Sequence, residues 1–241
     1  MFKQHINFTL ERGRSFSIIG PNGAGKSTLL HCLANLARLE SGAITVGGKR
    51  LDKMTRAETA RLIGYVPQNL TSVYGYNVPD FIVMGRAPYI SNFRQPTAGD
   101  FERVAQVMSQ LGITHLADKP YTELSGGEQQ QVCIARVLVQ DPAVILLDEP
   151  TSALDFGNQL KVIRLVRELA AKGYAIIMTT HNPDHAIMLA DAVGVMSRDG
   201  TLRVGSFRDV INEELLSDVY KTEVRIAYVE KIGRDACLAK L

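Results

Sequence analysis

The 241-residue sequence lacks several features that mark special classes of protein. It has only three cysteines, Cys32, Cys133 and Cys237, without the paired spacing of a zinc site or a disulfide framework, so we interpret them as ordinary thiols. No stretch reaches the roughly 18 to 20 apolar residues of a membrane-spanning helix. The first residues do not resemble a secretory signal. These absences predict a cytosolic chain that does not cross a bilayer.

An excess of charge of one sign is also missing. The chain has 27 Lys and Arg against 25 Asp and Glu, and the positive residues are scattered, which argues against nucleic acid as a partner. Hydrophobic residues make up 46% and charged residues 22%, as in ordinary globular proteins. The length favours one domain with an inserted lobe.

Strands and helices are expected to alternate along most of the chain. The expected elements are a strand at 14–20, a helix at 26–39, a strand at 61–66, a strand at 144–147, a helix at 157–171, and strands at 174–179 and 192–196. This order predicts a parallel sheet covered on both faces. Residues 70–125 instead combine turn signals with a helical stripe, so we expect them to form an inserted helical lobe.

Residues 20–27 have the spacing G-x-x-x-x-G-K-[ST] between the first strand and the first helix. Glycines let the backbone wrap around phosphates, and the helix start directs its amides at the anion. Lys26 would contact the β and γ phosphates, and the Ser27 hydroxyl would bind magnesium. A glycine-rich turn without a ligand is the alternative. The predicted nucleotide contacts are Gly20, Pro21, Asn22, Gly23, Ala24, Gly25, Lys26, Ser27 and Thr28.

Two adjacent carboxylates, Asp148 and Glu149, end the apolar run 144–147. Buried carboxylates are costly without a nearby cation, and a parallel strand delivers its last residues to the edge where ligands bind. We therefore expect Asp148 to hold magnesium and Glu149 to polarise the water that attacks the γ-phosphate. A solvated strand end is the alternative.

The segment 124–128, Leu-Ser-Gly-Gly-Glu, precedes a helix expected to run to residue 139. Ser125 can cap that helix while Gly126 and Gly127 leave amides open to an anion, and Glu128 completes the segment. This is a second phosphate site without a lysine. A two-fold dimer, in which each copy caps the other's ATP, is the simplest geometry that joins the two unlike halves.

The order of these motifs resembles the nucleotide-binding subunits of ABC transporters over nearly the whole chain. Besides the phosphate loop, the segment 124–128 and the carboxylates, the resemblance rests on Gln68, on residues 152–155 (Ser-Ala-Leu-Asp) and on His181. It implies an α/β P-loop NTPase fold with a RecA-like core, a small antiparallel β element and an inserted helical lobe. The implied division of the single domain 1–241 is a catalytic core at 1–69 and 126–205, a lobe at 70–125, and a C-terminal extension at 206–241.

The resemblance also implies residue roles. Gln68 would link core and lobe and sense magnesium and the attacking water, Asp155 would lie on a loop that crosses to the partner chain, and His181 would contact the γ-phosphate. The implied cofactors are ATP and Mg²⁺. The catalytic set is then Lys26, Gln68, Glu149 and His181, and the metal set is Ser27, Gln68 and Asp148.

The spacing of His181 and His185 also suggests zinc. Pro183 starts the next helix, however, so the two need not share a face, and no H-E-x-x-H pattern is present. We assign no role to His5, His31 and His115.

Within the family, the chain looks most like the ATPases of bacterial metal-chelate importers for siderophores, haem or cobalamin, on segments 77–88, 154–159 and 214–220. The implied partners are a second copy of the chain, two copies of a polytopic membrane permease and, indirectly, a substrate-binding protein, at the cytoplasmic face of the inner membrane. Molybdate-type importers and a soluble ABC ATPase of iron–sulfur assembly are the alternatives. A kinase or GTPase is disfavoured by the segment 124–128 and His181.

Two further expectations concern the lobe and the N-terminus. Residues 73–78 with Phe81, Val83 and Met84 either form a groove for a permease helix or are the core of the lobe. In the family, an adenine-stacking aromatic lies roughly 25 residues before the phosphate loop, and such stacking is worth about 1 to 3 kcal/mol. Only 19 residues precede Gly20, and Phe2 is a poor substitute, so weaker nucleotide affinity is expected.

Overall fold

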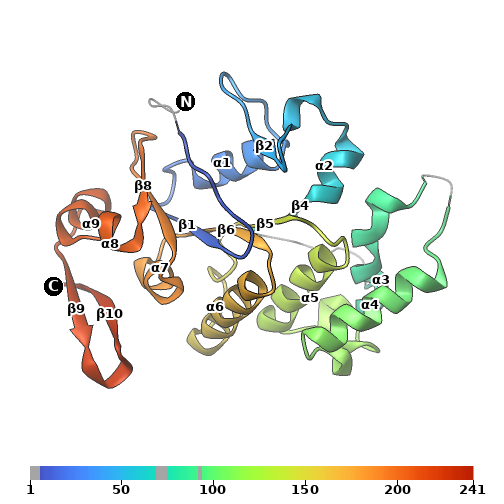
Figure 1. Ribbon diagram of the computed structural model, residues 1–241. Coiled ribbons are helices and arrows are strands. Elements are labelled where there is room, and N and C mark those ends of the chain that lie inside the picture. Colours follow the sequence, from blue (N-terminus) through green and yellow to red (C-terminus); the bar gives the residue numbers. More distant parts are fainter. Residues whose placement is uncertain (1–5, 69–74, 92–93, 241) are drawn as a thin grey trace.

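The computed structural model describes residues 6–68, 75–91 and 94–240 (Figure 1). Its centre is a six-stranded sheet in the order β4-β5-β6-β1-β7-β8. The strands are β1 (Ser15–Ile19), β4 (Ile63–Val66), β5 (Val144–Leu147), β6 (Ala175–Thr180), β7 (Ala192–Met196) and β8 (Leu202–Ser206). The first five in sequence are parallel, and β8 pairs with β7 in the antiparallel sense.

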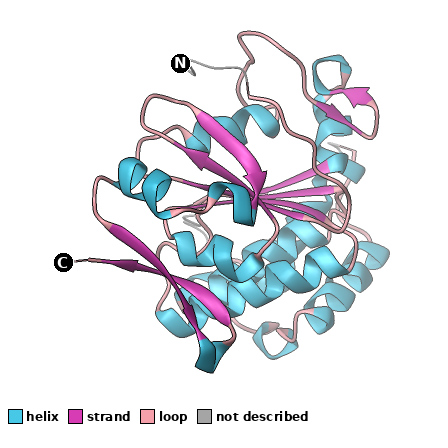
Figure 2. Ribbon diagram, turned by 60° about the vertical axis from the view of Figure 1, so that its left-hand side comes forward, coloured by secondary structure: helices cyan, strands magenta, loops and turns pink. Residues whose placement is uncertain are grey.

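Helices cover both faces of this sheet, with α1 on one side and α5 and α6 on the other (Figures 1 and 2). The α-helices are α1 (Lys26–Leu33), α2 (Arg56–Leu62), α3 (Val78–Val83), α4 (Ala98–Gln110), α5 (Gly126–Leu138), α6 (Phe156–Ala171), α7 (Pro183–Leu189), α8 (Phe207–Val210) and α9 (Glu213–Tyr220). Two small antiparallel sheets pair β2 (Thr45–Val46) with β3 (Lys49–Arg50) and β9 (Val224–Val229) with β10 (Arg234–Ala239). The predicted α/β fold with an antiparallel element is confirmed.

Strand β5 shows why the sheet needs cover on both faces. Its side chains alternate, so Ile145 and Leu147 pack with the cluster around α5 and α6, whereas Leu146 packs with Leu30 of α1. These three residues of β5 are fully buried, and Val144 at its start is partly buried. Such a strand reads as a continuous apolar run, which is typical of a parallel sheet between two helical layers.

Two predicted boundaries differ from the structure. The first helix ends at Leu33 rather than near residue 39, and Asn35 adopts a φ of 57°, in the left-handed region that interrupts a helix. The strand expected from residue 61 begins at Ile63, because Thr55 and Glu58 form a capping box that starts α2 and carries it to Leu62. Both errors lie at element ends, where local composition decides least.

The hydrophobic core runs without a break from the expected lobe into the sheet. One buried cluster joins Ile82 of α3 and Val104 of α4 to Ile134 of α5 and Ile145 of β5. Strands β4 to β6 therefore share their core with α3 and α4. The division at residues 70–125 stays a prediction.

Of the two interpretations of the lobe segment, a groove for a permease helix or the core of the lobe, burial supports the core for three of its residues. Val78, Phe81 and Val83 are buried in the core of α3, α4 and α5. Phe81 stacks on Tyr121 with ring centroids 4.1 Å apart, so its ring faces inward. Met84 and Tyr76 are part-exposed, and residues 73–74 lie outside the described residues.

Gly85 lies where the lobe touches α5. An added Cβ atom would overlap the Arg136 carbonyl oxygen and lie 2.7 Å from Val139. We expect Gly85→Ala to lower the free energy of unfolding by about 1 to 3 kcal/mol, because backbone cannot move aside as a side chain can. Gly99→Ala in α4, with no atom closer than 3.8 Å, is the matched control and should be neutral or stabilising. Equal urea midpoints for the two variants would contradict this close approach.

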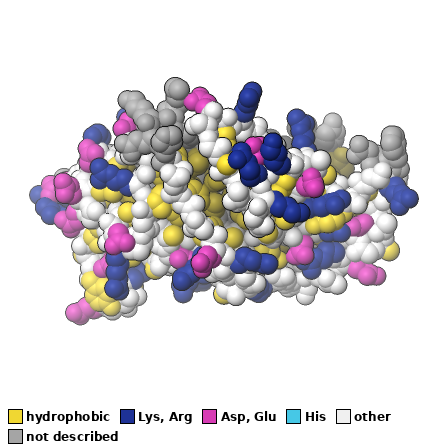
Figure 3. Space-filling view, turned by 45° about the horizontal axis from the view of Figure 1, so that its top comes forward, with side chains coloured by type: hydrophobic (Ala, Val, Ile, Leu, Met, Phe, Trp, Pro, Cys, Tyr) yellow, Lys and Arg dark blue, Asp and Glu magenta, His cyan; other side chains and the backbone are white. Residues whose placement is uncertain are grey.

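The surface shown in Figure 3 is mixed in charge. On the face in Figure 3, Lys and Arg side chains are interspersed with Asp and Glu.

The hairpin β9–β10 stands beside the main sheet in Figure 2 and is connected to α7 by an ion pair between Arg234 and Asp184. Among the described residues, no helix has the length and apolar character to span a bilayer.

The described N-terminal residues 6–14 form no strand, and Ile6, Phe8 and Leu10 pack against the core cluster on the α1 side of the sheet. Phe8 stacks on Phe16 of β1 with ring centroids 4.5 Å apart. The Phe8 ring therefore packs within the protein itself. Phe2 lies outside the described residues, and the expected weaker nucleotide affinity stays a prediction.

Candidate active site

The predicted site residues meet at the carboxyl ends of neighbouring parallel strands. Gly20 follows β1, Gln68 follows β4, Asp148 follows β5 and His181 follows β6. These four strands are adjacent in the sheet, in the order β4-β5-β6-β1. The edge where they end is the usual ligand site of an open α/β sheet.

The phosphate loop turns from β1 into α1 around Lys26. Gly20 comes so near the end of β7 that a Cβ atom would overlap the Met196 carbonyl oxygen, and Gly25 at the N-cap of α1 has a φ of 104°. Both positions therefore require glycine. The Lys26 side chain is only 4% exposed, and its ammonium donates to the carbonyls of Gly20 at 2.9 Å and Pro21 at 3.1 Å.

Lys26 also forms a buried ion pair with Glu149, 3.0 Å between Nζ and Oε1. Glu149 has a φ of 43°, and its amide donates to the Thr179 hydroxyl at 2.9 Å. A non-glycine residue in this region is uncommon and costs free energy, which is frequent at functional sites. The strained backbone turns the Glu149 carboxylate back over the phosphate loop.

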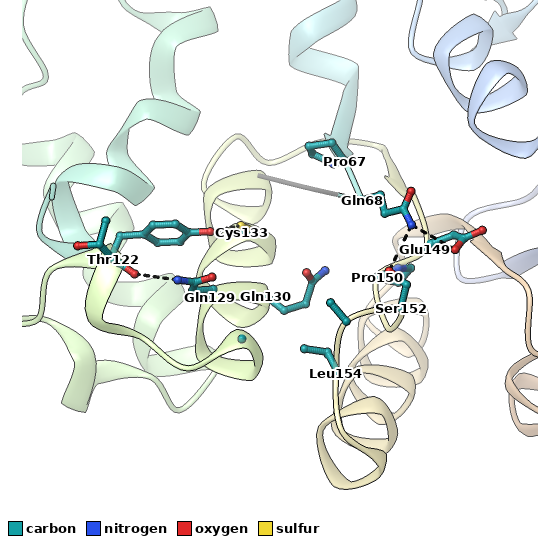
Figure 4. A pocket seen from close by; sticks show the side chains of 13 residues that line it. Pro67, Gln68, Thr122, Gln129, Gln130, Cys133, Glu149, Pro150, Ser152 and Leu154 are labelled. Carbon is teal, nitrogen blue, oxygen red and sulfur yellow. Dashed lines mark hydrogen bonds between the residues drawn. The ribbon is translucent and has the colours of Figure 1, made fainter. Parts of the chain in front are cut away.

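Two more predicted catalytic side chains reach the same carboxylate. His181 Nδ1 lies 3.1 Å from Glu149 Oε2. Gln68 Nε2 lies 3.4 Å from the same oxygen (Figure 4). Burial alone raises the pKa of Glu149, but the Lys26 hydrogen bond and charge, with His181, outweigh it and lower the pKa overall. Glu149 is therefore ionised at neutral pH, as a base that accepts a proton must be.

Asp148 lies deeper, 3% exposed, and its carboxylate accepts three hydroxyl hydrogen bonds. Ser27 at 3.1 Å and Thr179 at 2.7 Å donate to Oδ1, and Tyr65 at 3.3 Å donates to Oδ2. The hydroxyl of Ser27 and the carboxylate of Asp148 are hard oxygen ligands of the kind Mg²⁺ prefers, so this pair fits the metal. The described contacts of Gln68 go to Glu149 and Ser152 instead.

The segment Leu124–Glu128, here called the signature segment, opens α5. Ser125 is the N-cap and forms a capping box with Glu128, whose pKa is lowered by hydrogen bonds from the Ser125 side chain and backbone. Lys119 lies 3.8 Å from the Glu128 carboxylate and offsets part of its charge. The predicted cap is thus present, with an acidic side chain folded over it.

Asp155 belongs to the same surface as the signature segment. It caps α6 by accepting from the Asn158 amide at 2.8 Å, and an added Cβ at Gly127 would overlap the Asn158 side chain. A cavity of about 440 Å³ lies here, between Ser125 and Lys161. No phosphate-loop residue lines this cavity, so the two candidate phosphate sites are separate in one chain.

Comparison with known proteins identifies the family. Residues 3–152, more than half of the chain, match the sequence profile described as ABC transporter.

The chain belongs to the ABC transporter family.

Related proteins align with almost the whole length of this ABC ATPase. A molybdate import ATP-binding protein, MolC of Haemophilus influenzae, is 35% identical over 90% of this chain and 81% of its own. A hemin import ATP-binding protein, HmuV of Nocardia farcinica, is 36% identical over 92% and 76%. A solved structure, described as an inward-facing conformation of a candidate metal-chelate type ABC transporter, superposes with a TM-score of 0.89 at 32% identity and covers 99% of this chain and 92% of its own.

The sequence reading missed several residues that complete the site of this ABC ATPase. Tyr65 and Thr179 both contact the carboxylate of Asp148, and His31 Nε2 lies 3.0 Å from the Tyr65 hydroxyl. A strand tyrosine and a strand threonine look like ordinary sheet residues. Only the order of the strands shows that they flank Asp148.

His181 and His185 do not form a metal pair in this ABC ATPase. His185 is buried and bonded to the hydroxyls of Thr151 and Thr180, whereas His181 contacts Glu149. Burial lowers the pKa of His185, so it is neutral at neutral pH. Among the described residues, no group of three or more His, Cys, Asp and Glu could hold a metal ion.

Proposed function

We propose that the chain is the ATPase subunit of a bacterial importer for metal chelates, in which two copies close around two ATP molecules. The likeness to the structure described as metal-chelate type carries this proposal, since it spans 99% of the chain. The hemin import relatives point the same way. The molybdate import relative favours an oxyanion cargo as the second candidate.

The geometry supports a division of labour among the site residues. Lys26 would bind the β and γ phosphates, Ser27 and Asp148 would hold magnesium, and Glu149 would accept the proton of the attacking water while His181 and Gln68 orient it. Bound magnesium would neutralise phosphate charge. Before nucleotide binds, the ammonium of Lys26 is satisfied by Glu149 and two loop carbonyls. Phosphate must therefore draw Lys26 from Glu149, which leaves that carboxylate free to act as a base.

The two halves of the nucleotide site support the dimer. No residue of the phosphate loop lines the cavity beside Ser125 and Lys161. The phosphate loop around Lys26, in turn, is not covered by the N-terminus of α5 in the same chain. A second copy, related by two-fold symmetry, supplies each missing half. ATP then favours the closed pair and ADP does not, which biases the attached permease.

Co-purification and cargo stimulation test this function. The tagged chain, co-expressed with a permease and a binding protein of a metal-chelate importer from the same genome, should be retained with the membrane fraction and hydrolyse ATP in proteoliposomes. Addition of binding protein loaded with hemin or a ferric siderophore should stimulate hydrolysis, and molybdate should not. Stimulation by molybdate alone would establish the second candidate. Retention with soluble iron–sulfur assembly proteins instead of a permease would refute both.

A further inference from the structure

The carboxylate of Asp148 is held between three structural elements. Ser27 of α1 and Thr179 of β6 donate to Oδ1, at 3.1 and 2.7 Å. Tyr65 of β4 donates to Oδ2 at 3.3 Å and is the one described partner of that oxygen. The two oxygens of one buried carboxylate therefore have different surroundings. Oδ1 faces the loop that binds phosphate, and Oδ2 faces β4.

The proton directions in this network follow from its chemistry. The Tyr65 hydroxyl has a single proton and donates it to Asp148 Oδ2. The Tyr65 oxygen must then accept from His31 Nε2, which lies 3.0 Å away and carries the proton in that tautomer. The two rings meet edge to face, with centroids 5.6 Å apart. His31 thus fixes the hydroxyl that fixes Asp148.

We propose that Tyr65 is a positioning residue that sets the orientation of the Asp148 carboxylate for magnesium, with His31 holding Tyr65 in place. This inference rests on the proposed function, in which Asp148 binds magnesium beside ATP. Loss of the Tyr65 hydroxyl leaves Oδ2 buried without its donor, and the carboxylate rotates or admits water to recover a partner. Either change misplaces Oδ1 with respect to Ser27.

A merely structural role for Tyr65 predicts a different outcome. Its ring packs with the core cluster on the α1 side of the sheet, and phenylalanine preserves that packing. A structural tyrosine would therefore tolerate Tyr65→Phe, or would lose affinity for nucleotide with and without metal alike. A positioning tyrosine loses only the contribution that magnesium makes, since partners behind a metal ligand typically contribute about 10- to 100-fold to metal affinity.

The test compares binding of a fluorescent ATP analogue to the isolated chain in Mg²⁺ and in EDTA. For Tyr65→Phe we expect the gain in affinity produced by Mg²⁺ to shrink by about 10- to 100-fold, with affinity in EDTA within about twofold of the natural protein. Mn²⁺ binding in the presence of ADP, followed by electron paramagnetic resonance, should weaken in parallel. Tyr89→Phe is the matched control, because its hydroxyl donates to the Gln140 carbonyl, outside this network.

His31→Leu provides a second variant that does not touch Asp148. It should weaken the Mg²⁺-dependent gain severalfold, and it should add little in the Tyr65→Phe background because both act through one hydroxyl. An unchanged Mg²⁺ gain in Tyr65→Phe, or equal losses in Mg²⁺ and EDTA, would overturn the inference. If the natural protein itself gained nothing from Mg²⁺, the proposed function would fail before this inference was reached.

Discussion

Glu149→Gln is expected to hydrolyse ATP at least about 100-fold more slowly than the natural protein, because the amide cannot accept a proton from water. The neighbours of Glu149 explain why the substitution should slow the chemical step of hydrolysis rather than nucleotide binding. Without nucleotide, Lys26 and His181 lower the pKa of its carboxylate, and the turn at φ 43° directs it over the phosphate loop. The measurement is phosphate release at saturating ATP, with the assembled permease present.

The same substitution should leave nucleotide binding intact. In the free chain it removes the buried partner of Lys26, so thermal stability without nucleotide should fall. Mg-ATP supplies new negative charge to Lys26, so affinity should be equal or higher. Glu102→Gln on the exposed face of α4 serves as the control and should change neither quantity. Rapid turnover by Glu149→Gln would remove Glu149 from its role as the base.

Ser125→Asp is expected to abolish closure of the nucleotide-bound pair while sparing nucleotide binding to one chain. Aspartate is as good an N-cap as serine, so α5 keeps its N-cap, although aspartate cannot donate the hydrogen bond that the Ser125 hydroxyl gives to Glu128 at 2.7 Å. In the proposed closed pair, however, the added charge would face the phosphates of the partner's ATP, and two unit charges 4 Å apart repel by about 4 kcal/mol near a protein surface. Dimer dissociation constants from analytical ultracentrifugation should rise by at least about 100-fold, allowing for screening.

The matched control for this variant is Ser125→Asn. Asparagine caps equally well and has nearly the volume of aspartate without its charge, so a difference between the two variants reports that charge. Equal thermal stability of the two isolated chains would show that repulsion from Glu128 is not its cause. Binding of Mg-ATP to the isolated chain should be the same for both. If Ser125→Asp formed the closed pair as readily as Ser125→Asn, the signature segment would not face a phosphate.

The sequence predicted the motifs well because each is local. A phosphate loop between a strand and a helix, or a cap before α5, depends on residues adjacent in the chain, and the structure places Ser125 and Lys26 as expected. The strand 144–147 was predicted exactly, since an apolar run that ends in two carboxylates has few other interpretations. These features need no knowledge of the tertiary fold.

The contacts between strands could not be predicted in the same way. Tyr65 and Thr179 contact Asp148 because β4 and β6 flank β5. The order of strands in a sheet cannot be predicted from the spacing of residues within one segment. The pairing of Lys26 with Glu149 likewise joins residues over 120 positions apart. Apolar lobe residues such as Phe81 suit either a core or a groove, and only their burial decides between the two.

The most direct test of the shared nucleotide site is complementation between two inactive variants. Lys26→Ala impairs the phosphate loop, and Ser125→Asp impairs the signature segment, so each homodimer has two defective sites. In a mixed dimer, sharing across the interface combines one intact loop with one intact signature segment and restores a single working site. We expect that mixing the two variants, with permease present, raises hydrolysis above that of either variant alone. Activity that stayed at the level of the separate variants would contradict it.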